Sequence, residues 1–189
     1  MERKISTISI IVSLLFLPAI VGLSTLVIAS VDWANRGLAI ALLLLCVDQC
    51  RMAIVDLENV ALVQNLILAK PLAQDTRLTR FYGVTIATIA IELLGFYSAI
   101  GWLGWGAAIV LLSQVGFNLW AGIQLQPQES SAPIVPWGIR DRFPVLLADG
   151  LGIGLVGCWL AGVQPLIMAL GLLAMVLIYG VVKYGFSQA

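Results

Sequence analysis

Two charged residues interrupt an otherwise apolar segment of this chain. Asp48 and Arg51 lie three residues apart within residues 37–58, a segment rich in leucine, isoleucine and valine. Side chains at this spacing are neighbours on a helix and can form an ion pair. Ionisable groups among apolar helices either pair with one another to fix packing or mark the path of a proton or a solute.

Two further polar residues occur near the centres of later apolar segments. Glu92 lies within residues 81–100, and Gln114 lies within residues 103–125. If each segment is a membrane helix, Asp48, Glu92 and Gln114 lie at similar depth. Arg51 then lies about 4.5 Å further along its own helix. We therefore expect these four residues to form an intramembrane polar cluster.

This cluster has two interpretations. In the first it is structural, and its side chains pair with one another to fix the register of the helices. In the second it is a proton or solute site, where Asp48 and Glu92 share Arg51 and one carboxyl group stays protonated. At the level of the sequence both interpretations stay open.

Several kinds of chemistry lack their usual residues. The chain has no histidine, and histidine is the commonest general base, the commonest metal ligand and a frequent haem ligand. No Gly-x-Ser-x-Gly, Gly-x-x-x-x-Gly-Lys or His-Glu-x-x-His motif occurs. We therefore expect no metal, no cofactor and no enzymatic activity. The chain has three cysteines, all in apolar stretches, namely Cys46, Cys50 and Cys158. We expect them to pack as small hydrophobic residues, and we do not expect Cys46 and Cys50 to act as a redox pair.

The composition predicts an integral membrane protein. Of the 189 residues, 61% are hydrophobic and 11% are charged, whereas soluble domains average about 45–50% apolar and about 25% charged residues. The mean hydropathy is +1.04. Ten Lys and Arg balance ten Asp and Glu, so no net charge attracts nucleic acid.

The elements that must position the polar residues are helices of membrane-spanning length. A helix needs about 20 mainly apolar residues to cross the hydrocarbon layer, and turn-forming residues divide the chain into six such segments. We expect an all-α, polytopic protein with a single transmembrane domain over residues 1–189 and a proline-containing cytoplasmic loop at 126–144. The expected spans are residues 8–30, 37–58, 81–100, 103–125, 145–163 and 165–184.

Two points about the first spans have alternatives. Asp48 and Arg51 each cost about 2.5–3.5 kcal/mol at a helix centre, so a five-span protein without the second helix is the alternative to six. If the second helix forms, it is expected to continue to Ala69 as an amphipathic segment, ending before Pro71. Residues 8–30 are expected to stay as an uncleaved helix, the alternative being a cleaved signal peptide.

Lys and Arg predict the orientation, because they concentrate in cytoplasmic loops. With six spans and a cytoplasmic N-terminus, eight of the ten lie inside, Arg36 lies outside and Arg51 lies within the membrane. Both termini are then cytoplasmic, in a bacterial inner membrane or an internal organelle membrane. The eight are Arg3, Lys4, Lys70, Arg77, Arg80, Arg140, Arg142 and Lys183.

The fifth expected span carries a ridge of small residues. Gly150 and Gly154 form a Gly-x-x-x-Gly pair that Gly157 extends, and such a ridge lets helices approach closely. The ridge predicts a contact within the chain or with a partner. Asp149 precedes it near the helix N-terminus, where a carboxylate is stabilised by the helix dipole.

Two functions are consistent with these features. We expect an accessory or assembly partner of a larger membrane complex, because catalytic motifs are absent and a small-residue ridge is present. The alternative is a small transporter or solute-binding membrane subunit that uses the polar cluster. Expected partners are membrane lipid and either another membrane protein or a second copy of the chain.

The size and six-span layout resemble the small substrate-binding subunits of energy-coupling-factor vitamin transporters. The first span lacks the Ala-x-x-x-Ala docking pattern of that family. The resemblance is therefore one of architecture, and it implies no particular solute.

Overall fold

The computed structural model describes residues 6–69, 76–126 and 133–185. Within these ranges the chain forms six helices, each long and apolar enough to cross a membrane, which confirms the expected helical class and the six helices. A two-stranded antiparallel sheet accompanies them. The elements are α1 (Thr7–Ala29), α2 (Trp33–Ala69), α3 (Thr76–Gly101), α4 (Leu103–Trp120), β1 (Ile123–Leu125), β2 (Ile134–Pro136), α5 (Phe143–Leu160) and α6 (Pro165–Gly185).

The first two helices begin at side-chain caps. The Ser6 hydroxyl oxygen accepts a hydrogen bond from the Ser9 backbone N–H at 3.0 Å, and the Asp32 carboxylate accepts one from the Asn35 N–H at 3.0 Å. Such caps satisfy backbone donors that the first turn of a helix leaves free. The second helix continues to Ala69 as expected and has 37 residues, about 55 Å at 1.5 Å per residue. It is therefore longer than a hydrocarbon layer of about 30 Å.

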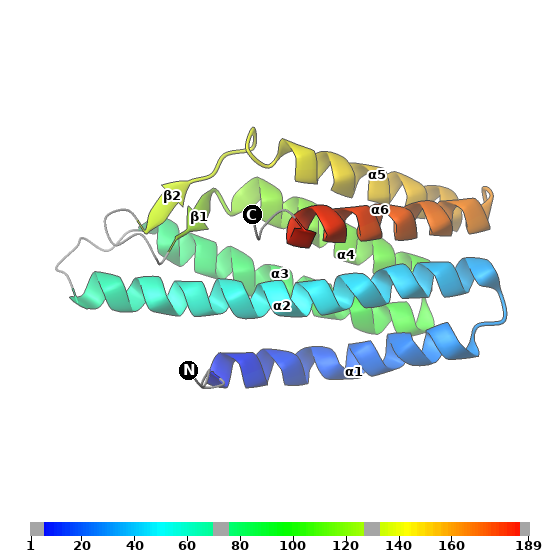
Figure 1. Cartoon of the computed structure of the whole chain (residues 1–189), viewed down its shortest axis with the longest axis horizontal. Coiled ribbons are helices and arrows are strands. Elements are labelled where there is room, and N and C mark those ends of the chain that lie inside the picture. Colours follow the sequence, from blue (N-terminus) through cyan, green and yellow to red (C-terminus); the bar gives the residue numbers. More distant parts are fainter. Residues whose placement is uncertain (1–5, 70–75, 127–132, 186–189) are drawn as a thin grey trace.

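The helices run roughly along one common axis (Figure 1). Helix α1 packs against α2 and α3, and α3 packs antiparallel to α4. Helix α5 packs on α4, α6 packs on α2, and α5 and α6 pack on each other. The beginning of α1, the end of α6, the far end of α2 and the β1–β2 sheet all face the same end of the bundle, and α2 and the sheet extend farthest toward it (Figure 1). We call this the hairpin end.

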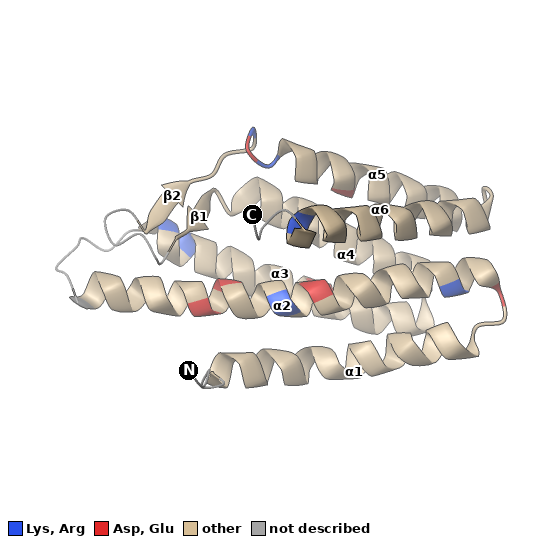
Figure 2. Ribbon diagram, viewed as in Figure 1, with Lys and Arg blue, Asp and Glu red and all other residues tan. Residues whose placement is uncertain are grey.

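Charged residues are unevenly placed along the bundle (Figure 2). Most of those in the described part of the chain lie between the middle of α2 and the hairpin end. Asp32 precedes α2 and Arg36 lies in its first turn, so both are at the opposite end, where α2 begins (Figure 1). Arg3, Lys4 and Lys70 fall outside the described residues, and the cytoplasmic assignment of the hairpin end stays a prediction.

Two hydrophobic clusters hold the bundle together. The large core joins side chains of all six helices and includes Phe16, Leu42, Phe96, Val110 and Leu172. The small core lies at the hairpin end, where the last part of α2 packs on α3, the end of α4 and the sheet. It consists of Val60, Val63, Leu78, Phe81, Ala121, Ile123 and Leu125.

Two glycines allow a close contact between α3 and α4. A Cβ atom added to Gly106 would lie 2.5 Å from the backbone of Ala99, and one added to Gly95 would lie 2.7 Å from the Val110 side chain. Such small residues let two backbones approach closely.

The ridge on α5 behaves differently. A Cβ atom added to Gly150, Gly154 or Gly157 would meet nothing within 4 Å. These three glycines therefore make no close contact within the described part of the chain, and a contact of the ridge with a partner stays a prediction.

The fourth helix is shorter than the sequence predicted. It ends at Trp120 rather than at residue 125, because Gly122 adopts a positive φ of 66°, a conformation that ends helices. The following residues form β1, which pairs with β2 in the register Ile123↔Pro136 and Leu125↔Ile134. The segment expected to be only a loop thus contributes a strand, while residues 127–132 of it lie outside the described ranges.

Candidate functional site

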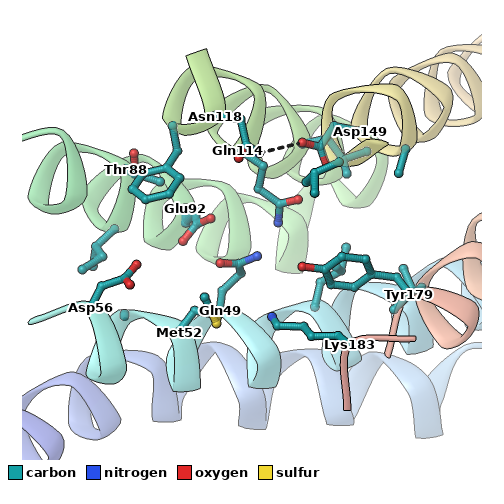
Figure 3. Close-up of a pocket in the computed structure, with 18 of the residues that line it drawn as sticks. Gln49, Met52, Asp56, Thr88, Glu92, Gln114, Asn118, Asp149, Tyr179 and Lys183 are labelled. Carbon is teal, nitrogen blue, oxygen red and sulfur yellow. Dashed lines mark hydrogen bonds between the residues drawn. The ribbon is translucent and has the colours of Figure 1, made fainter. Parts of the chain in front are cut away.

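A cavity of about 180 Å³ lies among helices α2 to α6 (Figure 3). We call it the central cavity. Along α3 and α4 it falls between the large core and the small core, where the side chains change from apolar to polar. Along α2 it extends from Leu45 to Asp56, about 16 Å of helix. The polar side chains that line it are Gln49, Asp56, Thr85, Thr88, Glu92, Gln114, Asn118, Asp149, Tyr179 and Lys183.

Two polar groups in the central cavity have no hydrogen-bond partner among the described residues. Glu92 on α3 is only 2% exposed, and its carboxyl group points into the cavity (Figure 3). Gln114 lines the facing wall from α4, and its Nε2 atom is buried. A buried polar group without a partner costs free energy. These two side chains therefore favour occupation of the cavity by water or by a polar ligand.

A chain of hydrogen bonds links the cavity to the sheet. Arg142, 7% exposed, donates from Nη2 to the Ile123 carbonyl oxygen at 2.9 Å and from Nη1 to Asn118 Oδ1 at 3.3 Å. The Asn118 amide in turn donates to Asp149 Oδ2 at 3.2 Å (Figure 3). Asp149 is thereby held on the cavity wall, beyond the first turn of α5.

An ion pair between α2 and α6 borders the central cavity. The Lys183 ammonium contacts both carboxylate oxygens of Asp48, at 2.8 and 3.0 Å, and the Tyr184 hydroxyl donates to the same carboxylate. Lys183 lines the cavity, whereas Asp48 does not. The sequence offered Arg51 as the partner of Asp48. In the structure the exposed Arg51 guanidinium instead lies 4.5 Å from the centre of the Tyr184 ring.

The four residues of the predicted cluster are therefore divided. Glu92 and Gln114 line one cavity, Asp48 reaches its border through Lys183, and Arg51 lies outside it. Sequence reasoning did not place Lys183 in the site. It counted this residue as an end-of-helix cation, because nothing in the sequence shows that α6 lies beside α2.

The central cavity contains more acidic than basic groups. Asp56, Glu92 and Asp149 contribute three carboxyl groups, and Lys183, the one cationic side chain on the described wall, is already paired with Asp48. Among the described residues no three cysteine, aspartate or glutamate side chains come close enough to share a metal ion. The carboxyl groups are thus spread along the cavity. This arrangement suits a proton or a small solute with one positive group.

The apolar part of the wall limits the type of solute. Five helices contribute aliphatic and thioether side chains beside the polar ones, including Leu45, Met52, Ile89, Leu111 and Val176. Mostly apolar walls with a few placed polar groups are typical of sites for small organic molecules. Comparison of the chain with models of protein families, with curated proteins and with solved structures finds no match.

Proposed function

We propose that this chain is a multi-pass membrane protein that binds a small organic cation in the central cavity, as the recognition step of transport. The observation that carries the proposal is the carboxyl group of Glu92, which is buried, faces the cavity and has no partner among the described residues. The six apolar helices support insertion in a membrane. The distribution of Lys and Arg supports a cytoplasmic hairpin end.

The charge balance explains why a cation would bind. A carboxylate in an apolar environment is costly unless it is protonated or paired with a positive charge. Lys183 contacts Asp48, and the Arg142 guanidinium donates to Asn118 and Ile123. Glu92 would therefore take its counter-charge from outside the described residues, as a proton or as a cationic solute that displaces the proton.

The remaining polar groups could orient such a solute. The amides of Gln49 and Gln114 and the hydroxyl of Tyr179 face the same space as Glu92 (Figure 3). They can donate to or accept from polar atoms of a bound molecule. A volume of about 180 Å³ limits the solute to a small amine or quaternary ammonium compound, or to a few water molecules.

Thermal unfolding of the purified protein tests the proposal. A series from ammonium through methylammonium to choline is added to the wild type and to Glu92→Gln. A ligand present at 100 times its Kd stabilises a protein by about 2.7 kcal/mol, or a rise in Tm of about 5–10 °C for a chain of this size. We expect this rise for at least one cation in the wild type and its loss in Glu92→Gln.

Glu58→Gln is the matched control. Glu58 also lies on α2, outside the central cavity, and accepts hydrogen bonds from the hydroxyls of Ser6 and Ser9, which a glutamine can still accept. This variant should keep the response to the cation. Equal responses in Glu92→Gln and the wild type would contradict the proposal, as would a wild type that no cation stabilises.

A second candidate is a role as an accessory or assembly partner of a larger membrane complex. It is favoured by the ridge of Gly150, Gly154 and Gly157, whose outer face meets nothing within the described chain. Purification in a mild detergent tests it: a partner should copurify with the wild type and be lost in Gly154→Leu. Gly180→Leu, at another open position, should retain the partner.

A further inference from the structure

A second hollow, of about 560 Å³, lies between α2 and α6. We call it the α2–α6 hollow. Its wall is mainly aliphatic, and Val47, Leu177 and Val181 on this wall are each more than half exposed. Gly180 also lines it, and a Cβ atom added there would meet nothing within 4 Å. An acyl chain could therefore lie along this wall without displacing any side chain.

The charged residues of the hollow carry one positive charge in excess. Asp48 is neutralised by Lys183, whereas the exposed Arg51 forms no ion pair with the described residues. The Arg51 guanidinium lies over the face of the Tyr184 ring. Stacking on a ring leaves the N–H edges of a guanidinium free, and these edges match the oxygens of a phosphate group.

The position of Arg51 along the helix suits a lipid headgroup. Helices α2 and α6 run in the same direction and start at the same end of the bundle (Figure 1). Arg51 and Tyr184 lie 18 and 19 residues after the first residues of these helices, or about 27–29 Å along them. This is close to the full thickness of a hydrocarbon layer, about 30 Å. The guanidinium then lies at the interface, and the aliphatic wall extends toward the middle of the membrane.

We propose that the α2–α6 hollow is a binding site for an anionic phospholipid, with Arg51 contacting the phosphate and an acyl chain lying along Val47, Leu177 and Val181. A single uncompensated positive charge complements a headgroup of net charge minus one. A zwitterionic lipid would bring a second cation close to Arg51 and Lys183, which the site does not balance. This proposal rests on membrane insertion of the helices and is independent of the solute in the central cavity.

Native mass spectrometry of the detergent-purified protein tests this site. The protein is stripped of lipid and titrated separately with dioleoyl phosphatidylglycerol and dioleoyl phosphatidylcholine. We expect the wild type to retain phosphatidylglycerol preferentially. In Arg51→Gln its apparent affinity should fall about fivefold to tenfold, since one basic side chain near a lipid surface contributes about 1 kcal/mol or more. Gly180→Leu, which fills the hollow and leaves its charges unchanged, should weaken binding of both lipids.

Two matched variants control for general effects. Arg36 also lies over an aromatic ring, that of Trp33 at 4.8 Å, but in the first turn of α2, at the opposite end of the bundle. Gly83 is another glycine with open space around it, outside the hollow. Arg36→Gln and Gly83→Leu should both retain phosphatidylglycerol as the wild type does.

Three outcomes would overturn the lipid site. These are equal retention of the two lipids by the wild type, unchanged binding in both Arg51→Gln and Gly180→Leu, and a protein dimer that Gly180→Leu dissociates. The last outcome would assign the hollow to a second copy of the chain. Arg51→Gln should meanwhile keep the cation-dependent rise in Tm, so failure of the lipid site and failure of the central cavity are distinguishable.

Discussion

Asp48 on α2 pairs with Lys183 on α6 at 2.8 Å, across 135 residues of sequence. The side chains of the two residues are 15% and 20% exposed, respectively. This pair neutralises the cation that borders the central cavity, and it joins the second helix to the last. The remaining charged groups of the central cavity are therefore carboxyl groups, whereas the remaining charged group of the α2–α6 hollow is the Arg51 guanidinium.

Loss of Lys183 should destabilise the protein more than loss of Arg51. Lys183→Met leaves the partly buried carboxylate of Asp48 without its counter-charge, which should cost about 1–3 kcal/mol of unfolding free energy. Arg51→Leu removes an exposed side chain, and its cost should stay within about 0.5 kcal/mol. Unfolding of the detergent-solubilised variants measures both changes.

The double variant Asp48→Asn with Lys183→Met completes a double-mutant cycle. It should recover much of the lost stability, because no charge is then left unpaired. If the double variant is no more stable than Lys183→Met alone, the Asp48–Lys183 ion pair is not what stabilises the contact between α2 and α6.

A methyl group at Gly106 should disrupt the packing of α3 against α4. In Gly106→Ala the new Cβ atom would lie 2.5 Å from the backbone of Ala99, so the helices must move apart, at a cost of about 1–3 kcal/mol. Gly150→Ala is the matched control, since a Cβ atom there meets nothing within 4 Å. Thermal unfolding should show a lower Tm for Gly106→Ala and an unchanged Tm for Gly150→Ala. Equal Tm values for the two variants would show that α3 and α4 are not in close contact at Gly106.

The helices could be predicted from the sequence because each is long and apolar, and the long second helix could be followed to Ala69. The strand at Ile123–Leu125 could not. A segment as short as Ile-Gln-Leu continues a helical pattern as readily as it forms a strand, and the strand depends on a partner that comes nine or more residues later. Gly122 was the local signal, as a residue that commonly ends a helix.

The site was predictable residue by residue but not in its pairing. The depth of Glu92 and Gln114 along their helices indicated that they could share one space, and both line the central cavity. The partner of Asp48 depends on which helix lies beside α2, and spacing within one segment favoured Arg51 over Lys183. The ridge at Gly150 likewise indicated close packing, but it could not show which way the ridge faces.

Reporter fusions test the proposed orientation. A fusion after Ala73 and one after Ser131 should both report the cytoplasm, because the Lys and Arg distribution assigns both connections to that side. A fusion after Asn35 should report the opposite side. A non-cytoplasmic signal at either of the first two sites would reverse the proposed topology.

The last prediction concerns the hydrogen-bond chain from the sheet to the central cavity. Asn118→Ala removes the acceptor for Arg142 Nη1 and the donor to Asp149. Two hydrogen bonds of about 1 kcal/mol each are lost, and one buried guanidinium N–H is left without an acceptor. We expect a loss of about 2–3 kcal/mol in unfolding free energy. Gln64→Ala, at an exposed position on α2, should change it by less than about 0.5 kcal/mol.

The same variant separates positioning from direct binding. Asn118 holds Asp149 on the cavity wall, while Glu92 approaches from α3 without its help. In Asn118→Ala the cation-dependent rise in Tm should therefore be smaller than in the wild type but still measurable, whereas Glu92→Gln should abolish it. A complete loss in Asn118→Ala, with the unliganded protein still folded, would make Asp149 rather than Glu92 the main counter-charge for the solute.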